Sequence, residues 1–463
     1  MRSGRLVTFV LFAVAATVVG CSSGSSDSDT EQSAPTLGEW HGQIEIPDHP
    51  LALGVNFTDA SSATIDIPAQ GLSGAPLKEV RTDPEAVEFA IAAIPGDPRF
   101  RGRFDAETET IVGDFTQSGQ SFPLRLARGK VEEPARPQEP KPPFPYKSED
   151  VTYRSGDITI AGTLTAPEGA GPFPAVLLIT GSGPQDRDEQ IVGHKPFLLI
   201  ADTLTRAGYA VLRADDRGVG GTGGDLEESN YTDLSGDAAA GVGFLRGRSE
   251  IDPTRIGLFG HSEGGYLAPL VAARPDSGVA FVVLMAGPAV PGSEVLIEQN
   301  RLIGAATGTP PEEVDTRVRQ TTELVDVLKR NDIEGAQDLV RRQNAELPED
   351  QRVSDEQLTA GINPILAALV NYDPAPALSA LRVPVFAFYG GHDLQVPAAQ
   401  SEQPMREHLA ADPDATVHVF PGLNHLMQPA PTGNPSEYAG IETTVAPEVL
   451  TYVTDWLDQR TRK

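Results

Sequence analysis

The feature that most constrains the fold of this chain is the stretch at residues 260–264, Gly-His-Ser-Glu-Gly. It has the G-x-S-x-G spacing of a turn that lifts Ser262 from the end of a strand. Residues 255–259 form a short, mostly apolar run that predicts a buried strand, and residues 266–273 can continue as a helix. The chain holds 46 glycines in 463 residues, so the pattern alone would also fit a loop with a solvated serine. The flanking strand and helix therefore carry the argument.

The first 21 residues predict a bacterial lipoprotein signal peptide rather than part of a domain. A basic start precedes an apolar run over residues 6–19, which is too short for a stable spanning helix. The sequence Val-Val-Gly-Cys that ends at Cys21 resembles a lipobox, although Val18 stands where leucine is more usual. Cys21 is the single cysteine of the chain, so it has no partner for an internal disulfide. An ordinary signal peptide with an incidental cysteine is the alternative.

Lipidation of Cys21 would place the protein outside the cytoplasmic membrane and anchor it to the cell envelope. Residues 22–36 are small, polar and acidic, and predict a flexible tether. The formal net charge of −29 disfavours nucleic acid as a partner. The expected partner of this end of the chain is therefore the membrane, through the lipid. The oligomeric state stays open.

Residues 37–128 predict a small all-β domain, a sandwich or barrel, because short apolar–polar alternations are separated by turn residues. The strands are expected at residues 42–46, 51–57, 63–67, 87–91, 100–104, 110–115 and 122–126. Proline-rich residues 129–147 then predict a semi-extended linker.

Residues 148–463 predict a doubly wound, mostly parallel α/β sheet with an antiparallel start. Its strands are expected at residues 151–153, 158–164, 175–179, 209–212, 256–259, 279–285, 385–389 and 416–420. Residues 291–381 contain no core strand but have helical periodicity at 311–330, 333–347 and 357–370, with a kink or restart at Pro364. A segment of this length predicts a helical lid near the carboxyl ends of the strands.

Two further side chains follow predicted strands in short loops. Asp393 comes after the strand at 385–389, and His425 after the strand at 416–420. The order Ser262, Asp393, His425 is the one that an α/β-hydrolase requires. A serine hydroxyl needs a base, a neutral imidazole can take its proton, and a carboxylate can fix the tautomer of the imidazole. A loop histidine and a turn-forming aspartate are the alternatives for these two residues.

An oxyanion hole needs two backbone N–H donors. Glu263, which follows the nucleophile, is expected to supply one of them. The loop after residue 179 should supply the other, from Ser182 or, as second choice, Gly181; a simple turn is the alternative. No histidine pair has zinc-ligand spacing beside a third ligand, so no metal site is predicted. The glycine-rich residues 215–223 lack a P-loop lysine and predict a structural loop.

Three motifs give a specific resemblance to a family. Residues 181–188, 216–220 and 260–265 resemble bacterial α/β-hydrolases of the EstD-like esterase group, which is related to the serine aminopeptidase-like, S33-type hydrolases. The resemblance covers residues from about 151 to the end, and residues 37–128 are similar to a β-domain fused before such hydrolases. It implies carboxylesterase activity on short acyl esters, no cofactor, and a triad at Ser262, Asp393 and His425. Thr180 departs from the histidine that many α/β-hydrolases carry there.

The sequence therefore predicts a serine hydrolase that cleaves short-acyl esters through an acyl-enzyme on Ser262. A peptidase, an aminopeptidase or a thioesterase would use the same triad, and the sequence does not separate these substrates. A catalytically inactive, envelope-associated binding lipoprotein is the alternative of a different class.

Overall fold

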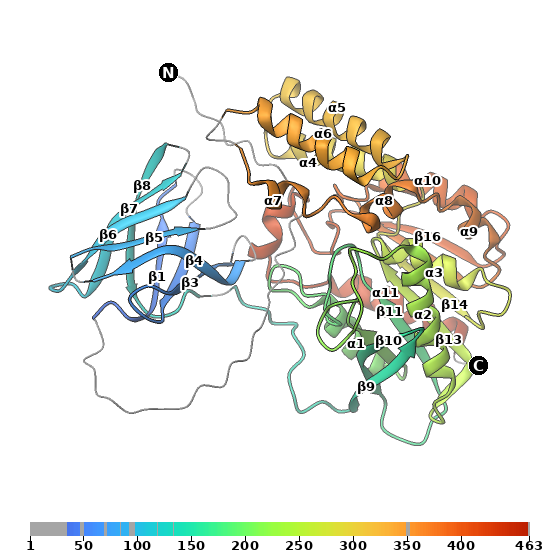
Figure 1. Ribbon diagram of the computed structural model, residues 1–463. Helices are drawn as coiled ribbons and strands as arrows, with labels where there is room; N and C mark the ends of the chain where they lie inside the picture. Colours follow the sequence, from blue (N-terminus) through green and yellow to red (C-terminus); the bar gives the residue numbers. More distant parts are fainter. Residues whose placement is uncertain are drawn as a thin grey trace. The chain divides into compact units, whose positions relative to one another are not determined.

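The computed structural model describes residues 35–46, 51–68, 72–83, 85–91, 98–117, 119–132, 134–348 and 352–461. Contacts divide the chain into two compact units (Figure 1), one running to Ala135 and including Gln337–Gly361, the other comprising Arg136–Ala336 and Ile362–Lys463. The predicted signal peptide with Cys21 and most of the predicted tether lie outside the described residues. Within the described residues, no helix is both long and apolar enough to cross a membrane.

The first unit contains a closed antiparallel barrel of eight strands, in which the last strand pairs with the first. The strands are β1 Gly38–Ile44, β2 Leu51–Phe57, β3 Ala63–Ile67, β4 Leu72–Thr82, β5 Val87–Ile91, β6 Arg99–Asp105, β7 Thr110–Gln117 and β8 Gln120–Arg128. Alternate residues point inward, so Trp40 and Phe100 are fully buried at its centre. The predicted all-β domain is thus a barrel. Strand β4 was not predicted, because Gly74 and Pro76 interrupt its alternation.

The second unit is built on one mixed sheet of eight strands in the order β16-β15-β14-β13-β11-β12-β10-β9. The strands are β9 Lys147–Ser155, β10 Ile158–Ala166, β11 Phe173–Ile179, β12 Ala210–Ala214, β13 Ile251–His261, β14 Phe281–Met285, β15 Val385–Gly390 and β16 Ala415–Phe420. The hairpin β9–β10 is antiparallel, β10 also pairs antiparallel with β12, and the six strands β11 to β16 run parallel to one another. This confirms the predicted fold class. The central strands are buried on both faces, which explains their unbroken apolar runs.

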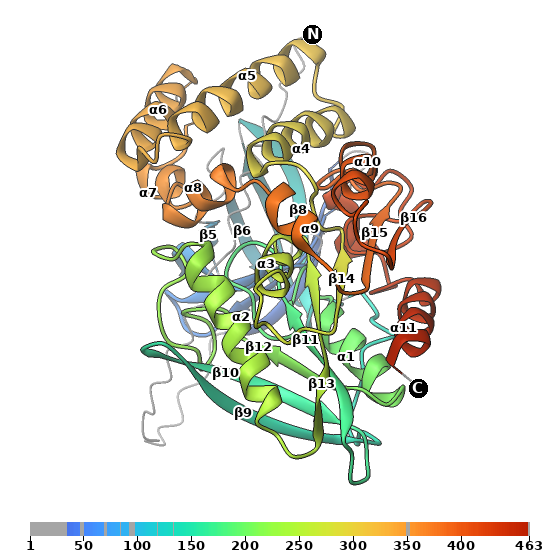
Figure 2. The same ribbon diagram turned by 90° about the vertical axis from the view of Figure 1, so that its right-hand side faces the viewer.

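Helices cover both faces of this sheet (Figure 2). Helices α1 (Pro196–Arg206) and α11 (Pro447–Thr461) pack with one hydrophobic cluster, which contains Phe197 and Trp456. Helices α2 (Tyr231–Arg246), α3 (Gly264–Ala272) and α10 (Ala398–His408) pack with the other. Asn230 caps α2 by accepting from the Thr232 and Asp233 amides.

Six helices fill the interval between β14 and β15: α4 Gly292–Ala306, α5 Pro311–Leu328, α6 Ile333–Glu346, α7 Asp355–Thr359, α8 Pro364–Asn371 and α9 Ala375–Ala380. The predicted restart at Pro364 is the beginning of α8. Contacts join α8 to α2, and α9 to α3 and α10 (Figure 2). Residues 337–361, from α6 to just beyond α7, group with the first unit, although the sequence predicts one continuous lid.

The second unit begins inside the segment predicted as a linker. Arg136 donates to the carbonyls of Ala439 and Ile441, and Gln138 both donates to Val445 and accepts from Thr444. These bonds tie the proline-rich chain to the loop before α11.

His194 is buried in the same region. Its Nδ1 lies 3.0 Å from the Thr444 hydroxyl and its Nε2 lies 3.0 Å from the Tyr438 carbonyl oxygen. Because the carbonyl only accepts, Nε2 carries the proton and Nδ1 accepts from the hydroxyl. Burial lowers the pKa of His194 to about 4, although its bond to Tyr438 acts in the opposite direction. His194 is therefore a neutral structural residue.

We predict that acidification destabilises the second unit partly through His194. An unfolded histidine has a pKa near 6.5, so unfolding takes up a proton between that pH and about 4, and stability falls as pH falls through this window. The loss amounts to up to about 2 kcal/mol between pH 7 and pH 5. His194→Gln lacks this proton uptake, so the gap in Tm between wild type and variant should narrow at pH 5 in thermal unfolding.

Asn230→Ala is the control, because it removes the cap of α2 and no titratable group. Its gap in Tm from wild type should stay constant between pH 7 and pH 5. A His194→Gln gap that behaves in the same way would contradict the prediction.

Candidate active site

Ser262 sits on a sharp turn between the end of β13 and the start of α3. Its φ of +52° is in the left-handed region, which is costly for a residue with a side chain. The turn is held because the Ser262 amide donates to the Met285 carbonyl at 2.9 Å, and the Ser262 carbonyl accepts from the Gly265 amide at 2.8 Å. The elbow predicted from the pentapeptide is present.

Asp393 and His425 meet as a buried pair beyond β15 and β16. Nδ1 of His425 lies 2.8 Å from Oδ2 of Asp393, and the two residues are 4% and 3% exposed. The other carboxylate oxygen, Oδ1, accepts from the amides of Gln395 and Val396. A carboxylate fixed in this way holds the proton of His425 on Nδ1 and leaves Nε2 as the basic nitrogen.

The elbow at Ser262 lies beside the loop that follows β16 and carries His425, here called the histidine loop. The ring of His261, the residue before Ser262, is 4.9 Å from the ring of His425 between centroids. Nε2 of His261 is 3.3 Å from the carbonyl oxygen of His425. The three residues predicted as a triad therefore come from loops that gather at one edge of the sheet. Their catalytic roles stay a prediction.

His261 has a carboxylate partner that sequence reasoning missed. Its Nδ1 lies 2.8 Å from Oε1 of Glu189, and Glu189 is completely buried. Burial lowers the pKa of His261 while the facing carboxylate raises it, and the net direction is upward. Glu189 follows the run Asp-Arg-Asp, so in the sequence it looks like part of a solvated charged segment.

The segment from Thr180 to Gln185, the oxyanion loop, runs beside Ser262. A Cβ added to Gly181 would lie 3.3 Å from the Cβ of Ser262. The Gly181 amide donates to Oε1 of Glu189 at 2.7 Å, so the second-choice oxyanion donor is already engaged. Within the described residues, neither the Ser182 amide nor the Glu263 amide donates a hydrogen bond. These two predicted donors keep their N–H groups available.

Asp216 holds both ends of the oxyanion loop. Its carboxylate accepts from the Thr180 hydroxyl at 2.8 Å and from the Gln185 amide at 2.9 Å. Burial raises the pKa of Asp216 to about 8, against the opposing effect of these two donors. Thr180, the departure noted in the sequence, thus has a structural partner. The glycine-rich segment that contains Asp216 acts here as a structural support, as predicted.

The side chain of Glu263 turns into the protein core. It accepts from the Tyr231 hydroxyl at 2.7 Å, and burial raises its pKa to about 7 against the effect of that bond. A cavity of about 70 Å3 lies between this side chain and the oxyanion loop, where Thr180, Gly181 and Gly183 contribute to its wall. Leu177 and Leu267 give it an apolar part.

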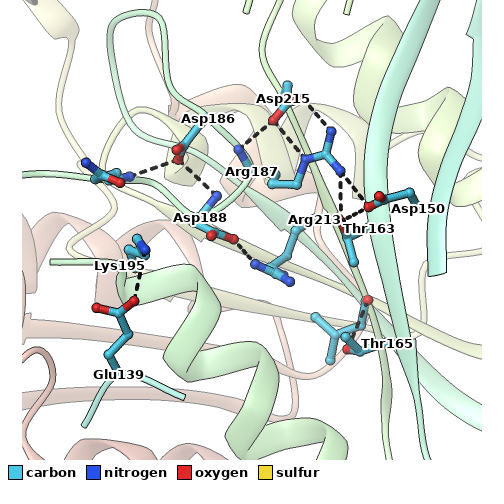
Figure 3. A network of polar contacts seen from close by, with 12 residues as sticks. Glu139, Asp150, Thr163, Thr165, Asp186, Arg187, Asp188, Lys195, Arg213 and Asp215 are labelled. Atoms are coloured by element: carbon cyan, nitrogen blue, oxygen red, sulfur yellow. Dashed lines mark hydrogen bonds and ion pairs between the residues drawn. The ribbon is translucent and has the colours of Figure 1, made fainter. Parts of the chain in front are cut away.

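A polar network holds the chain that follows the oxyanion loop (Figure 3). Arg187 donates to both oxygens of Asp215, at 3.0 and 2.6 Å, and Asp188 pairs with Arg213. Arg187 also reaches Asp150 at 3.1 Å. These contacts hold the chain just before Glu189 against the sheet.

Three other histidines of the second unit serve elsewhere. His392 bonds to the Ala430 carbonyl, His408 bonds to the Ala289 carbonyl, and His418 stacks on Tyr452. The described residues contain no group of three or more His, Cys, Asp or Glu side chains that could hold a metal ion.

The comparisons with known proteins agree with this arrangement. A family model described as serine aminopeptidase, S33 matches residues 195–428. Esterase EstD of Thermotoga maritima is 31% identical over 285 residues, which are 60% of this chain and 60% of EstD. YtaP of Bacillus subtilis, named as a hydrolase, is 33% identical over 122 residues, which are 23% of this chain and 41% of YtaP. The matches thus span three fifths or less of these curated relatives.

Among solved structures, an esterase from Pyrococcus furiosus is similar in fold. The alignment covers 72% of this chain and 99% of the esterase, with 16% sequence identity and a TM-score of 0.43. The family model spans about half of the 463 residues and includes Ser262, Asp393 and His425. The resemblance predicted from the motifs is confirmed, and the chain belongs to the serine aminopeptidase, S33 family of α/β-hydrolases.

Proposed function

We propose that this protein is a serine carboxylesterase that uses Ser262, His425 and Asp393. The observation that carries the proposal is the buried His425–Asp393 pair, 2.8 Å between Nδ1 and Oδ2, beside a serine held in the left-handed conformation of an elbow. A serine hydroxyl on its own is a poor nucleophile at neutral pH. A histidine whose free nitrogen is its Nε2 supplies the missing base.

In the proposed reaction, Oγ of Ser262 attacks the ester carbonyl while Nε2 of His425 takes its proton. The negative charge that forms on the carbonyl oxygen accepts hydrogen bonds from the amides of Ser182 and Glu263. Losing one such donor typically raises the barrier by about 3 kcal/mol. His425 returns its proton to the alcohol as the C–O bond breaks, which leaves an acyl-enzyme. Water, activated by His425, then releases the acid and restores Ser262.

The proposal of short-acyl esters rests on the relatives. Esterase EstD is among them, and the motifs of this chain that resemble the EstD-like group imply short acyl esters.

Replacing the nucleophile tests the proposal directly. Ser262→Ala should lower hydrolysis of p-nitrophenyl acetate by at least about 10^3-fold, because no acyl-enzyme can form. A fluorophosphonate should label wild type on the peptide that holds Ser262 and leave the variant unlabelled. Asp393→Asn should lower kcat by about 10^2- to 10^4-fold, since it loses the carboxylate that orients His425.

Ser401→Ala is a control, because it removes the hydroxyl of another serine, one that is buried on α10 and lies outside the proposed site. It should keep wild-type turnover. Turnover retained by a folded Ser262→Ala variant would reject the mechanism. A wild-type protein that neither turns over esters nor reacts with fluorophosphonate would instead be the inactive binding lipoprotein considered from the sequence.

The family description favours a second candidate substrate, since its model is that of a serine aminopeptidase. Amides, thioesters and esters with the same acyl group pass through the same kind of acyl-enzyme. We predict that kcat/KM is highest for p-nitrophenyl acetate, lower for the matching acetyl thioester, and at least about 10^2-fold lower than for the ester with an aminoacyl p-nitroanilide. An anilide preference would make the protein a peptidase.

We also propose that the enzyme is attached to the cell envelope through a lipid on Cys21, which lies outside the described residues. Two or more acyl chains on one residue hold a protein stably at a membrane, at roughly 0.8 kcal/mol per buried methylene. Cys21→Ser should therefore move the protein from the membrane fraction to the soluble fraction of an expressing bacterium, and should abolish incorporation of an alkyne-tagged palmitate. An unlabelled wild type would favour an ordinary signal peptide.

A further inference from the structure

Glu189 is a fully buried carboxylate for which the proposed mechanism has no chemical role. Oε1 accepts two hydrogen bonds, from the Gly181 amide at 2.7 Å and from Nδ1 of His261 at 2.8 Å. Oε2 is buried and has no hydrogen-bond partner in the described part of the chain. Burying a carboxylate with half of its acceptors unused is costly. Its position therefore calls for an explanation beyond packing.

The backbone at Glu189 is strained as well. Its φ is +53°, a left-handed conformation that non-glycine residues adopt only when their surroundings force it. Those surroundings include the three residues just before Glu189. Arg187 and Asp188 pair with Asp215 and Arg213 (Figure 3), and the Glu189 amide donates to the Asp186 carbonyl at 2.9 Å. The network forces this one side chain inward, toward the oxyanion loop.

On the oxyanion loop, two side chains fix the peptides on either side of the Ser182 amide. Glu189 holds the N–H of Gly181, one residue before. Gln185 donates from Nε2 to the carbonyl of Ser182 at 3.2 Å, one peptide after. The peptide between these two fixed points carries the N–H of Ser182. Its direction is thus set by groups that never touch the substrate.

The same carboxylate reaches the other two loops of the site. Through its Nδ1, His261 ties the elbow to Glu189, and through its Nε2 it lies 3.3 Å from the carbonyl of His425. One buried carboxylate therefore joins the oxyanion loop, the residue before the nucleophile and the backbone of the histidine loop. A displacement of any one of the three would be opposed by the other two.

We propose that Glu189 is a positioning residue that orients the Ser182 amide toward the oxyanion. Through His261, it also keeps the oxyanion loop, the elbow and the histidine loop in fixed positions relative to one another. This inference rests on the proposed function, since it assigns the role through Ser262 and the oxyanion hole. In this role Glu189 helps to stabilise the transition state, through the Ser182 amide, and does not contribute to binding of the ester. Its loss should therefore lower kcat while KM stays nearly constant.

Two variants and one inhibitor test the role of Glu189. Glu189→Gln keeps an acceptor oxygen but no charge, and should lower kcat for p-nitrophenyl acetate by about 3- to 10-fold; Glu189→Ala keeps neither and should lower it by about 10^2-fold. KM should change by less than about 2-fold. An aryl trifluoromethyl ketone, which adds Ser262 and places an anionic oxygen in the oxyanion hole, should lose affinity by the same factor as kcat/KM.

Asp202→Asn is the matched control. Asp202 is a buried carboxylate on α1 that accepts from the Tyr146 hydroxyl at 2.8 Å, and it makes no hydrogen bond to the oxyanion loop, the elbow or the loop of His425 in the described residues. This variant should keep kcat and inhibitor affinity per active site, counted by fluorophosphonate titration. If Glu189→Ala does not fold, Glu189→Gln still gives the graded result.

The outcomes separate the two proposals. If Ser262→Ala keeps activity, the proposed function fails. If Ser262→Ala is inactive and Glu189→Gln matches wild type in kcat and inhibitor affinity, only the role of Glu189 fails. A Glu189→Gln variant that loses active sites but keeps kcat per site and inhibitor affinity would make Glu189 a purely structural residue, and would also overturn the inference.

Discussion

The active centre depends on how closely the backbone of α3 approaches the ends of the central strands. A Cβ on Gly260 would lie 2.1 Å from the carbonyl oxygen of Gly264, and one on Gly264 would lie 2.3 Å from the carbonyl oxygen of Ile179. Neither position has room for a side chain. This contact forces the left-handed turn at Ser262 and brings the oxyanion loop, which begins after Ile179, against the elbow. The rest of the site is assembled around that contact.

Much of this arrangement could be predicted because it follows from local patterns. Parallel strands buried on both faces are unbroken apolar runs, and the loops at their carboxyl ends meet at one edge of the sheet. The positions of Ser262, Asp393 and His425, each just after a strand, were therefore enough to predict that their loops gather at one edge of the sheet. The glycines around Ser262 predicted the close approach for the same reason.

The parts that were missed depend on contacts between distant residues. Nothing in the run of charged residues around Glu189 distinguishes a buried carboxylate from a solvated one, because its burial is imposed by Arg187 and Asp188 pairing with other strands. Strand β4 has broken alternation, and pairing with β3 and β5 determines it instead. The grouping of residues 337–361 with the first unit likewise follows from packing and not from helical periodicity.

Three buried carboxyl groups surround the proposed oxyanion hole, where negative charge would oppose the reaction. Burial raises the pKa of Asp216 to about 8 and that of Glu263 to about 7, so near neutral pH Asp216 is mostly protonated and Glu263 partly so. Glu189 faces His261, whose pKa is raised, so the charge of that carboxylate is met by an imidazole ready to hold a proton. Asp216 and Glu189 thus hold the oxyanion loop through hydrogen bonds to their carboxyl oxygens, while the raised pKa of Asp216 and the facing His261 limit the negative charge near that loop. In the proposed reaction, the amides of Ser182 and Glu263 are then left to stabilise the developing oxyanion.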